Sequence, residues 1–300
     1  MAREIVDADR REVRELLAQV TGRSEDAKLE RMGGLTNRTY RVIYPDGMQY
    51  VVRIPGEGTE ELIVRNDEKI STELACRVGI DAELLYFGSN GAKVTEYIPG
   101  AVTMSAELFA DEKRMAQAAE IFRRLHNSGE DTGVPFEVFD MAAGYERIIH
   151  ENHVSMYPDY EETKAVVMAI KKEIDAVCGI HKVPCHNDPL CENWVVSDSG
   201  RMYLIDWEYA GMNDPLWDVA DLSIEAGFDA ESDAKFLCAY LERKAEPADY
   251  RHFLAEKLYV DYLWTLWAKT RVPYDGQPME DWASERYARL KKNIQACKEI

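Results

Sequence analysis

The sequence predicts an α+β protein with two lobes: a small antiparallel-sheet lobe over residues 1–98 and a mainly helical lobe over residues 99–300. Short β-rich runs separated by turn residues fill most of the first hundred positions. Apolar residues at helical spacing fill most of the remainder. Pro99-Gly100 interrupts the chain where one pattern gives way to the other, and we place the boundary there.

The first lobe is predicted to hold a small sheet and two helices. We expect helices at residues 7–21 and 60–78 and strands at residues 39–44, 48–54, about 83–88 and about 92–98. Pro45-Asp46-Gly47 joins the first two strands as a hairpin, because proline presets φ and glycine accepts positive φ. Gly88-Ser89-Asn90-Gly91 marks the turn of a second hairpin.

The second lobe is predicted to be helical apart from one embedded hairpin. Helices are expected around residues 115–125, 144–156, 160–178, 215–226, 230–243, 249–270 and 280–298. The hairpin joins Trp194–Val196 to Met202–Ile205 through Ser197-Asp198-Ser199-Gly200. Because a strand pair returns the chain close to where it left, residues just outside the two strands should be neighbours.

The composition narrows the class of partner. Lys and Arg total 36 against 55 Asp and Glu, which gives a formal net charge of −19. Nucleic acids and anionic membranes bind clustered positive charge, so we expect neither as a partner. No segment reaches the roughly 20 apolar residues that span a bilayer. An acidic surface would attract a small cation, although acidity can equally serve solubility alone.

The cysteines and the N-terminus predict a cytoplasmic protein. The six cysteines are scattered, without a C-x-x-C pair or a metal-like cluster, as is typical of reduced intracellular thiols. The first residues are charged throughout and lack the apolar region of a signal peptide. The sequence leaves the oligomeric state open.

The residues with the strongest chemical signature form an ordered motif, H-x-D-x₄-N followed thirteen residues later by I-D. It runs from His186 through Asp188 and Asn193 to Asp206. Phosphoryl transfer needs one carboxylate to orient and deprotonate the attacking hydroxyl, a role that suits Asp188. It also needs hard oxygen ligands for Mg²⁺, which Asn193 and Asp206 offer. The alternative is a capping Asp, a turn Asn and a strand-end Asp that never meet.

This motif resembles the catalytic and metal-binding segments of the protein-kinase-like fold. It is most similar to the aminoglycoside phosphotransferase and choline kinase superfamily, whose segment ends I-D-W/F-E, as Ile205-Asp206-Trp207-Glu208 does here. The resemblance implies ATP and Mg²⁺ as cofactors. It also implies that Asp218, in Trp217-Asp218-Val219-Ala220, and His186 are structural residues that hold the catalytic loop.

A glycine loop and a strand cation are the expected contacts to the nucleotide phosphates. Gly33-Gly34-Leu35-Thr36-Asn37 precedes the first hairpin, and glycine backbone amides can approach phosphates closely; a simple turn is the alternative. We assign Gly34, Thr36 and Asn37 to this loop. The resemblance places Arg53 where the fold has its phosphate-binding cation, with Glu68 as its ion-pair partner and Glu73 as the competing choice.

The hinge between the lobes is assigned from the resemblance alone. In this fold the hinge backbone binds the adenine edge, and the corresponding residues are Glu96, Tyr97 and Ile98. Side chains matter little to such contacts, so the sequence does not test the assignment.

Two tryptophans suggest the phosphate acceptor. Trp264 and Trp267 lie three residues apart on a predicted helix and so share a face. A quaternary ammonium has no N–H to donate and is bound by aromatic faces with a carboxylate. Core packing is the usual alternative for helical tryptophans.

The chain resembles the choline/ethanolamine kinase family, specifically bacterial choline kinases, from about Gly33 to about Tyr287. The resemblance implies that a pocket for choline also includes Asp188, Glu208, Tyr209, Glu225 and Trp282. The expected reaction is ATP-dependent phosphorylation of the choline hydroxyl. The alternatives are another acceptor, namely ethanolamine, thiamine, an aminoglycoside or a sugar, and a non-catalytic nucleotide-binding protein on the same fold.

Overall fold

The computed structural model describes residues 6–32, 37–56, 64–179 and 181–299. It confirms the predicted α+β fold and separates into two compact units. The first unit comprises Met1–Met104 and Glu192–Ala210, and the second comprises Ser105–Cys191 and Gly211–Ile300. The first unit thus takes in the embedded hairpin, which lies a hundred residues beyond the predicted boundary at residue 98.

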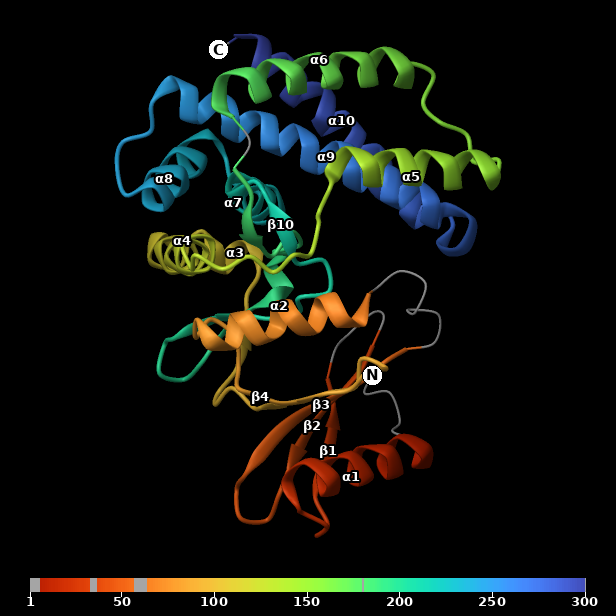
Figure 1. The fold of residues 1–300 in the computed structure, drawn as a ribbon, viewed down its shortest axis with the longest axis vertical. Helices are drawn as coiled ribbons and strands as arrows, with labels where there is room; N and C mark the ends of the chain where they lie inside the picture. The colour runs from red at the N-terminus through yellow and green to blue at the C-terminus, as the bar shows by residue number, and fades with distance from the viewer. Residues whose placement is uncertain (1–5, 33–36, 57–63, 180, 300) are drawn as a thin grey trace. The chain divides into compact units, whose positions relative to one another are not determined.

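The first unit is built on a five-stranded antiparallel sheet of order β1-β2-β3-β5-β4 (Figure 1). Its strands are β1 (Lys28–Arg31), β2 (Arg38–Ile43), β3 (Gln49–Ile54), β4 (Leu84–Phe87) and β5 (Lys93–Glu96). Helix α1 (Asp7–Thr21) packs Val13 and Leu17 against Tyr40, Val42 and Val52 of this sheet. Apolar residues three or four apart therefore give α1 its buried face. Helix α2 (Arg65–Arg77) lies between β3 and β4 in the chain.

The embedded hairpin belongs to the first unit because its partners are there. Strands β8 (Trp194–Val196) and β9 (Met202–Leu204) extend a small sheet with β6 (Val102–Thr103). The Leu204 amide donates to the Ile80 carbonyl at 2.9 Å, and the Asp198 amide donates to the Pro99 carbonyl at 2.9 Å. These bonds fix the hairpin to the chain on either side of β4 and β5.

The second unit is mostly helical. Its elements are α3 (Ala106–Phe109), α4 (Glu112–His126), α5 (Val138–Glu151), α6 (Tyr160–Cys178), β7 (Val183–Cys185), β10 (Gly211–Asn213), α7 (Pro215–Glu225), α8 (Ala230–Leu241), α9 (Pro247–Asp275) and α10 (Gln277–Glu299). Helix α9 packs against α5, α7 and α10, and Figure 1 shows it running through the middle of this unit. Residues on all sides of this helix are buried, as expected of a central helix, and they include the charged Glu256, Lys257, Asp261 and Lys269.

Several predicted boundaries were wrong. Helix α5 spans 138–151 rather than 144–156, because His153 takes a left-handed conformation with φ 54° just after the helix ends. Helix α9 continues through Pro273 to Asp275. The predicted helix ended at residue 270, before the proline, because proline usually ends a helix. The strands β1, β6, β7 and β10 were not predicted, since two to four residues carry too little pattern.

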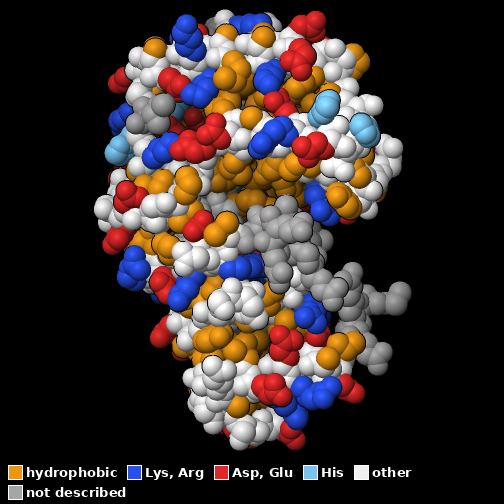
Figure 2. Space-filling model, turned by 45° about the vertical axis from the view of Figure 1, so that its right-hand side comes forward, with side chains coloured by type: hydrophobic (Ala, Val, Ile, Leu, Met, Phe, Trp, Pro, Cys, Tyr) orange, Lys and Arg blue, Asp and Glu red, His pale blue; other side chains and the backbone are white. Residues whose placement is uncertain are grey.

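Acidic and basic side chains are interspersed over the face drawn in Figure 2. Within the described residues, none of the helices has the length and apolar character needed to cross a bilayer.

Candidate active site

The hairpin places Asn193 and Asp206 side by side in the first unit. Asn193 ends a 3₁₀ turn that begins at Cys191, and its carbonyl accepts the Ile205 amide at 2.9 Å. Ile205 is thus paired with Asn193, and Asp206 is the next residue along the chain. Of the two carboxylate oxygens of Asp206, Oδ1 is buried and makes no hydrogen bond to any described residue. It lies 3.7 Å from the Arg53 guanidinium, and it remains available as a hard oxygen donor.

Asp206 is held in a strained backbone conformation. Its φ of 70° lies in the left-handed region, which costs a residue other than glycine about 1–3 kcal/mol. The adjacent Trp207 is fully buried and donates its indole N–H to Asp81 Oδ2 at 3.0 Å. Burial raises the pKa of Asp81 to about 6. The surrounding bonds thus impose a conformation on Asp206 that the residue would not adopt alone.

Beside Asp206, a buried cluster pairs two arginines with two glutamates. Arg53 lies 2.6 Å from Glu68, and Arg65 lies 2.8 Å from the other oxygen of Glu68. Arg65 also contacts Glu208 at 2.9 Å, and Arg53 reaches Glu208 at 3.4 Å. Of the two glutamates considered as partners of Arg53, it is Glu68 that forms the ion pair.

The competing Glu73 instead contacts Lys69 at 3.8 Å on the exposed side of α2.

The pKa of Glu68 reflects both its burial and its charged neighbours. Burial alone would raise its pKa, but Lys93, Arg53 and Arg65 outweigh burial and lower it. Glu208 differs, because burial and the nearby Asp206 raise its pKa above the ordinary value.

Sequence reasoning missed Arg65, which shares Glu68 with Arg53. The available signal was its position three residues before Glu68 on one helix. The structure also explains Gly91 beside it. Gly91 has φ 88°, and an added Cβ would lie 2.5 Å from the Arg65 Nε. Its carbonyl accepts Arg53 at 2.9 Å.

Among the described residues, Asn37, Glu96, Tyr97 and Ile98 were also predicted for nucleotide binding, and they lie in the first unit. Gly34 and Thr36 lie outside the described residues. Asn37 donates its side-chain amide to Glu208 at 2.8 Å. The predicted hinge comprises Glu96 at the end of β5 and the following residues Tyr97 and Ile98.

Two first-unit residues had been assigned to the acceptor pocket. The Glu208 carboxylate is engaged by Asn37, Arg53 and Arg65, so the structure joins it to the arginine cluster. Tyr209 is partly buried next to it. Their contact with an acceptor remains a prediction from the resemblance.

In the second unit, Asp218 anchors the loop that carries Asp188. Its carboxylate accepts the backbone amides of His186 and Asn187, each at 2.8 Å. Asn187 has φ 67°, and its carbonyl accepts the Trp217 indole at 3.0 Å. The Asp188 amide donates to His186 Nδ1 at 3.3 Å. These buried hydrogen bonds hold the backbone of the loop that carries Asp188.

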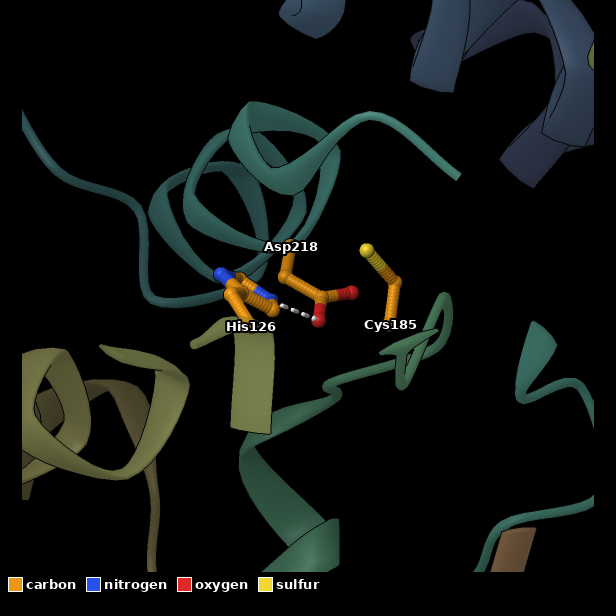
Figure 3. A group of neighbouring side chains, drawn as sticks. All are labelled: His126, Cys185 and Asp218. Carbon is orange, nitrogen blue, oxygen red and sulfur yellow. Dashed lines mark hydrogen bonds and ion pairs between the residues drawn. The ribbon is translucent and has the colours of Figure 1, made fainter. Parts of the chain in front are cut away.

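Figure 3 shows that His126 and Cys185 approach the same Asp218 carboxylate. His126 Nε2 lies 2.9 Å from Asp218, and its Nδ1 lies 2.9 Å from the Tyr240 hydroxyl. Burial, with Asp218 nearby, raises the pKa of the Cys185 thiol well above its usual range. Metal binding by cysteine requires the thiolate, so we interpret this group as a hydrogen-bonded anchor.

The three predicted acceptor tryptophans form one aromatic group. Trp264 and Trp267 meet edge to face with ring centroids 6.1 Å apart, and Trp267 and Trp282 have centroids 6.0 Å apart. Trp264 is buried. An edge-to-face group presents ring faces in different directions, which is the arrangement needed to surround a cation.

A cation of the protein already lies against this group. The Arg286 guanidinium carbon lies 4.0 Å from the centroid of the Trp282 ring, and Arg286 forms an ion pair with Glu225. Glu225 is thus paired within the chain, which the sequence did not reveal. Asp261 is fully buried, accepts Arg289 at 2.7 Å and lies 3.5 Å from Arg286.

A second buried ion pair in this unit gives a pH-dependent prediction. His252 lies 3.0 Å from Asp214 and 3.6 Å from Glu256. Burial opposes its charge, but the bonds to these carboxylates outweigh burial and raise the pKa of His252 to about 10. A histidine whose pKa is raised on folding contributes its full stabilisation at pH values below its ordinary pKa of 6.5. The contribution is lost as the pH rises through the pKa of the folded state, about 10.

We therefore expect His252→Gln to cost about 2 kcal/mol of unfolding free energy at pH 6, and little at pH 10.5. Urea unfolding at both values measures the difference. His150→Gln removes an exposed histidine and serves as the control. A loss from His252→Gln that stays the same at both pH values would contradict the pairing.

Comparison with known proteins gives a consistent result. Residues 29–255 match the phosphotransferase enzyme family. A choline/ethanolamine kinase family protein from Mesorhizobium loti is 35% identical, with 95% of this chain and 94% of that one covered and a TM-score of 0.83. The choline kinase LicA from Streptococcus pneumoniae is 29% identical, with coverage of 97% and 100% and a TM-score of 0.80.

A structure of LicA in complex with AMP is also 29% identical, with coverage of 96% and 98% and a TM-score of 0.76. The family match covers the motif from His186 to Asp206, and the structural similarities cover at least 95% of the chain. The chain therefore belongs to the phosphotransferase enzyme family, and within it to the choline/ethanolamine kinases.

Proposed function

We propose that this enzyme transfers the γ-phosphoryl group of ATP to the hydroxyl of choline. The observation that carries the choice of acceptor is the group of three tryptophans in contact with a guanidinium and neighbouring carboxylates. Cation–π contacts contribute about 0.5–2 kcal/mol each, so several rings with one carboxylate suffice for a usable affinity. ADP release measured with choline, ethanolamine and a panel of other alcohols tests the proposal. The proposal is contradicted if the enzyme turns over none of these alcohols.

Asp188 is assigned as the group that orients the choline hydroxyl and accepts its proton. The anchoring of its loop through Asp218 supports this role, because a general base must be held in place. Asn193 and Asp206 would hold Mg²⁺, which would neutralise charge on the phosphates. The buried Asp206 Oδ1, which makes no hydrogen bond to the residues that the structure describes, fits such a ligand.

Arg53 is assigned to the nucleotide phosphates, with Glu68 as the residue that positions it. Arg65 and Glu208 complete the same cluster, so we give Glu208 a positioning role there. Gly34, Thr36 and Asn37 are proposed to approach the phosphates, and the backbone from Glu96 to Ile98 to bind adenine. We propose a cytoplasmic location, where ATP is available and the six free cysteines stay reduced.

Replacing Trp264 tests the aromatic contribution. We expect Trp264→Leu, which keeps apolar bulk but removes the π face, to raise the KM for choline about 2–30-fold while leaving the KM for ATP unchanged. Trp264→Phe restores an aromatic face and should recover part of the loss. Steady-state kinetics with both substrates distinguish the variants, and equal KM values for choline in the two would argue for simple core packing.

Ethanolamine is the second candidate acceptor. Its primary ammonium donates hydrogen bonds to carboxylates, and Glu225 and Asp261 provide acidic groups beside the tryptophans. The ratio of kcat/KM for the two alcohols decides between them. Under the choline proposal, Trp264→Leu lowers this ratio, because the quaternary ammonium depends on ring faces more than the primary one does.

A further inference from the structure

Helix α7 carries a buried carboxyl group that neither the motif nor the aromatic group accounts for. Asp221 is 1% exposed, and neither of its carboxylate oxygens has a hydrogen-bond partner among the described residues. Buried polar side chains are almost always hydrogen-bonded, since an unsatisfied one costs free energy. The position therefore calls for a partner from outside the chain.

The surroundings of Asp221 connect it to the proposed acceptor pocket. Glu225 lies one helical turn further along the same face of α7. Charge interactions act on Asp221 from Glu225, Asp188 and Asp218, which oppose its ionisation, and from Arg286, which favours it. Arg289 on the same helix as Arg286 also interacts with it. Asp221 thus lies within the electrostatic reach of both the proposed base and the residue on the Trp282 ring.

Arg286 does not satisfy this carboxyl group. Its guanidinium forms its ion pair with Glu225, and its Nη1 lies 3.5 Å from Asp261. The Nε and Nη1 atoms are buried without a hydrogen-bond partner in the part of the chain described. Arg289 contacts Asp261 through two nitrogens, at 2.7 and 2.9 Å.

The charges of this group are therefore unequal. Three buried or partly buried carboxyl groups, Asp221, Glu225 and Asp261, face two guanidinium groups, Arg286 and Arg289. Glu225 and Asp261 each pair with an arginine, whereas neither oxygen of Asp221 has a hydrogen-bond partner in the part of the chain that the structure describes. Burial, reinforced by Glu225, raises the pKa of Asp221 well above its usual range.

We propose that Asp221 is the counter-ion of the cationic head group of the substrate, and that Arg286 positions Glu225 and the Trp282 ring around it. The inference rests on the proposed function, because it concerns the same acceptor pocket. In the bound complex the Asp221 carboxylate neutralises the ammonium. The rings supply shape and Asp221 supplies charge selectivity.

Charge selectivity can be measured with choline and its uncharged isostere, 3,3-dimethylbutan-1-ol. In the wild type, kcat/KM should favour choline. We expect Asp221→Asn to lower the choline:isostere ratio by about tenfold or more, since the lost partner is a nearby unit charge. Turnover of the isostere and the KM for ATP should change little. Glu231→Gln removes one negative charge from an exposed position on α8 and should leave the ratio unchanged.

Proton release gives a second readout. A bound cation lowers the pKa of a neighbouring carboxyl group, so calorimetry of choline binding in two buffers of different ionisation enthalpy should show more proton release at pH 7 by the wild type than by Asp221→Asn. Removing a carboxyl group whose pKa is raised should not destabilise the fold at pH 8, because its ionisation opposes folding there. Thermal melting at pH 8 therefore verifies that the variant is folded.

The outcomes separate the two proposals. If the wild type phosphorylates neither choline nor ethanolamine, the proposed function fails. Two results with a wild type that phosphorylates choline would overturn this inference and leave Asp221 a structural residue. One is that Asp221→Asn lowers turnover of choline and of the isostere equally. The other is that Asp221→Asn releases as much proton on choline binding as the wild type.

Discussion

Asp188→Asn is expected to lower kcat for choline by about 10²–10⁴-fold, the usual contribution of a positioned general base. An amide cannot accept the proton of the attacking hydroxyl. The loop geometry should survive the change, because Asp218 holds the loop through the backbone amides of His186 and Asn187. The loss should therefore appear in kcat, with the KM for ATP nearly unchanged.

The matched control for this variant is Asp198→Asn, which removes the same charge from an exposed hairpin turn. It should retain wild-type kcat. Single-turnover measurements separate the chemical step from product release. If Asp188→Asn kept kcat within a few-fold of wild type, while its melting temperature was unchanged, Asp188 would not be the base.

The parts of this site that the sequence predicts are those set by local spacing. The H-x-D-x₄-N segment and the I-D thirteen residues later place Asn193 and Asp206 at the two ends of a short hairpin, and the Ile205-to-Asn193 bond shows that closure. The role of Asp218 came from the family resemblance of Trp217-Asp218-Val219-Ala220, and in the structure its carboxylate accepts the backbone amides of His186 and Asn187.

The parts that could not be predicted depend on distant partners. The resemblance assigned Glu225 to the choline pocket without indicating an ion-pair partner, and its partner Arg286 lies 61 residues further along the chain. The burial of Asp221 follows from how α7, α9 and α10 pack, and nothing in its immediate sequence indicates it. Charge pairing between elements is a property of tertiary packing, so a sequence pattern reveals the candidates but not which of them are already neutralised.

The arginine–glutamate cluster of the first unit gives the largest expected effect on stability. Glu68 has a side chain that is fully buried and serves Arg53 at 2.6 Å and Arg65 at 2.8 Å, with Lys93 at 3.9 Å. Removing one member of a buried ion pair leaves its partners charged without compensation, which costs about 3–5 kcal/mol. We therefore expect Glu68→Gln to lower the free energy of unfolding by that amount.

Glu73→Gln is the matched control, because the Glu73 pair with Lys69 is about half exposed on the same helix and should contribute no more than about 1 kcal/mol. Urea unfolding of both variants at pH 7 measures the difference, and equal losses would contradict the assignment. Glu68→Gln should also raise the KM for ATP, since Arg53 loses the contact that positions it. If the variant instead lost stability while the KM for ATP stayed unchanged, Arg53 would be a structural cation of the sheet rather than a phosphate ligand.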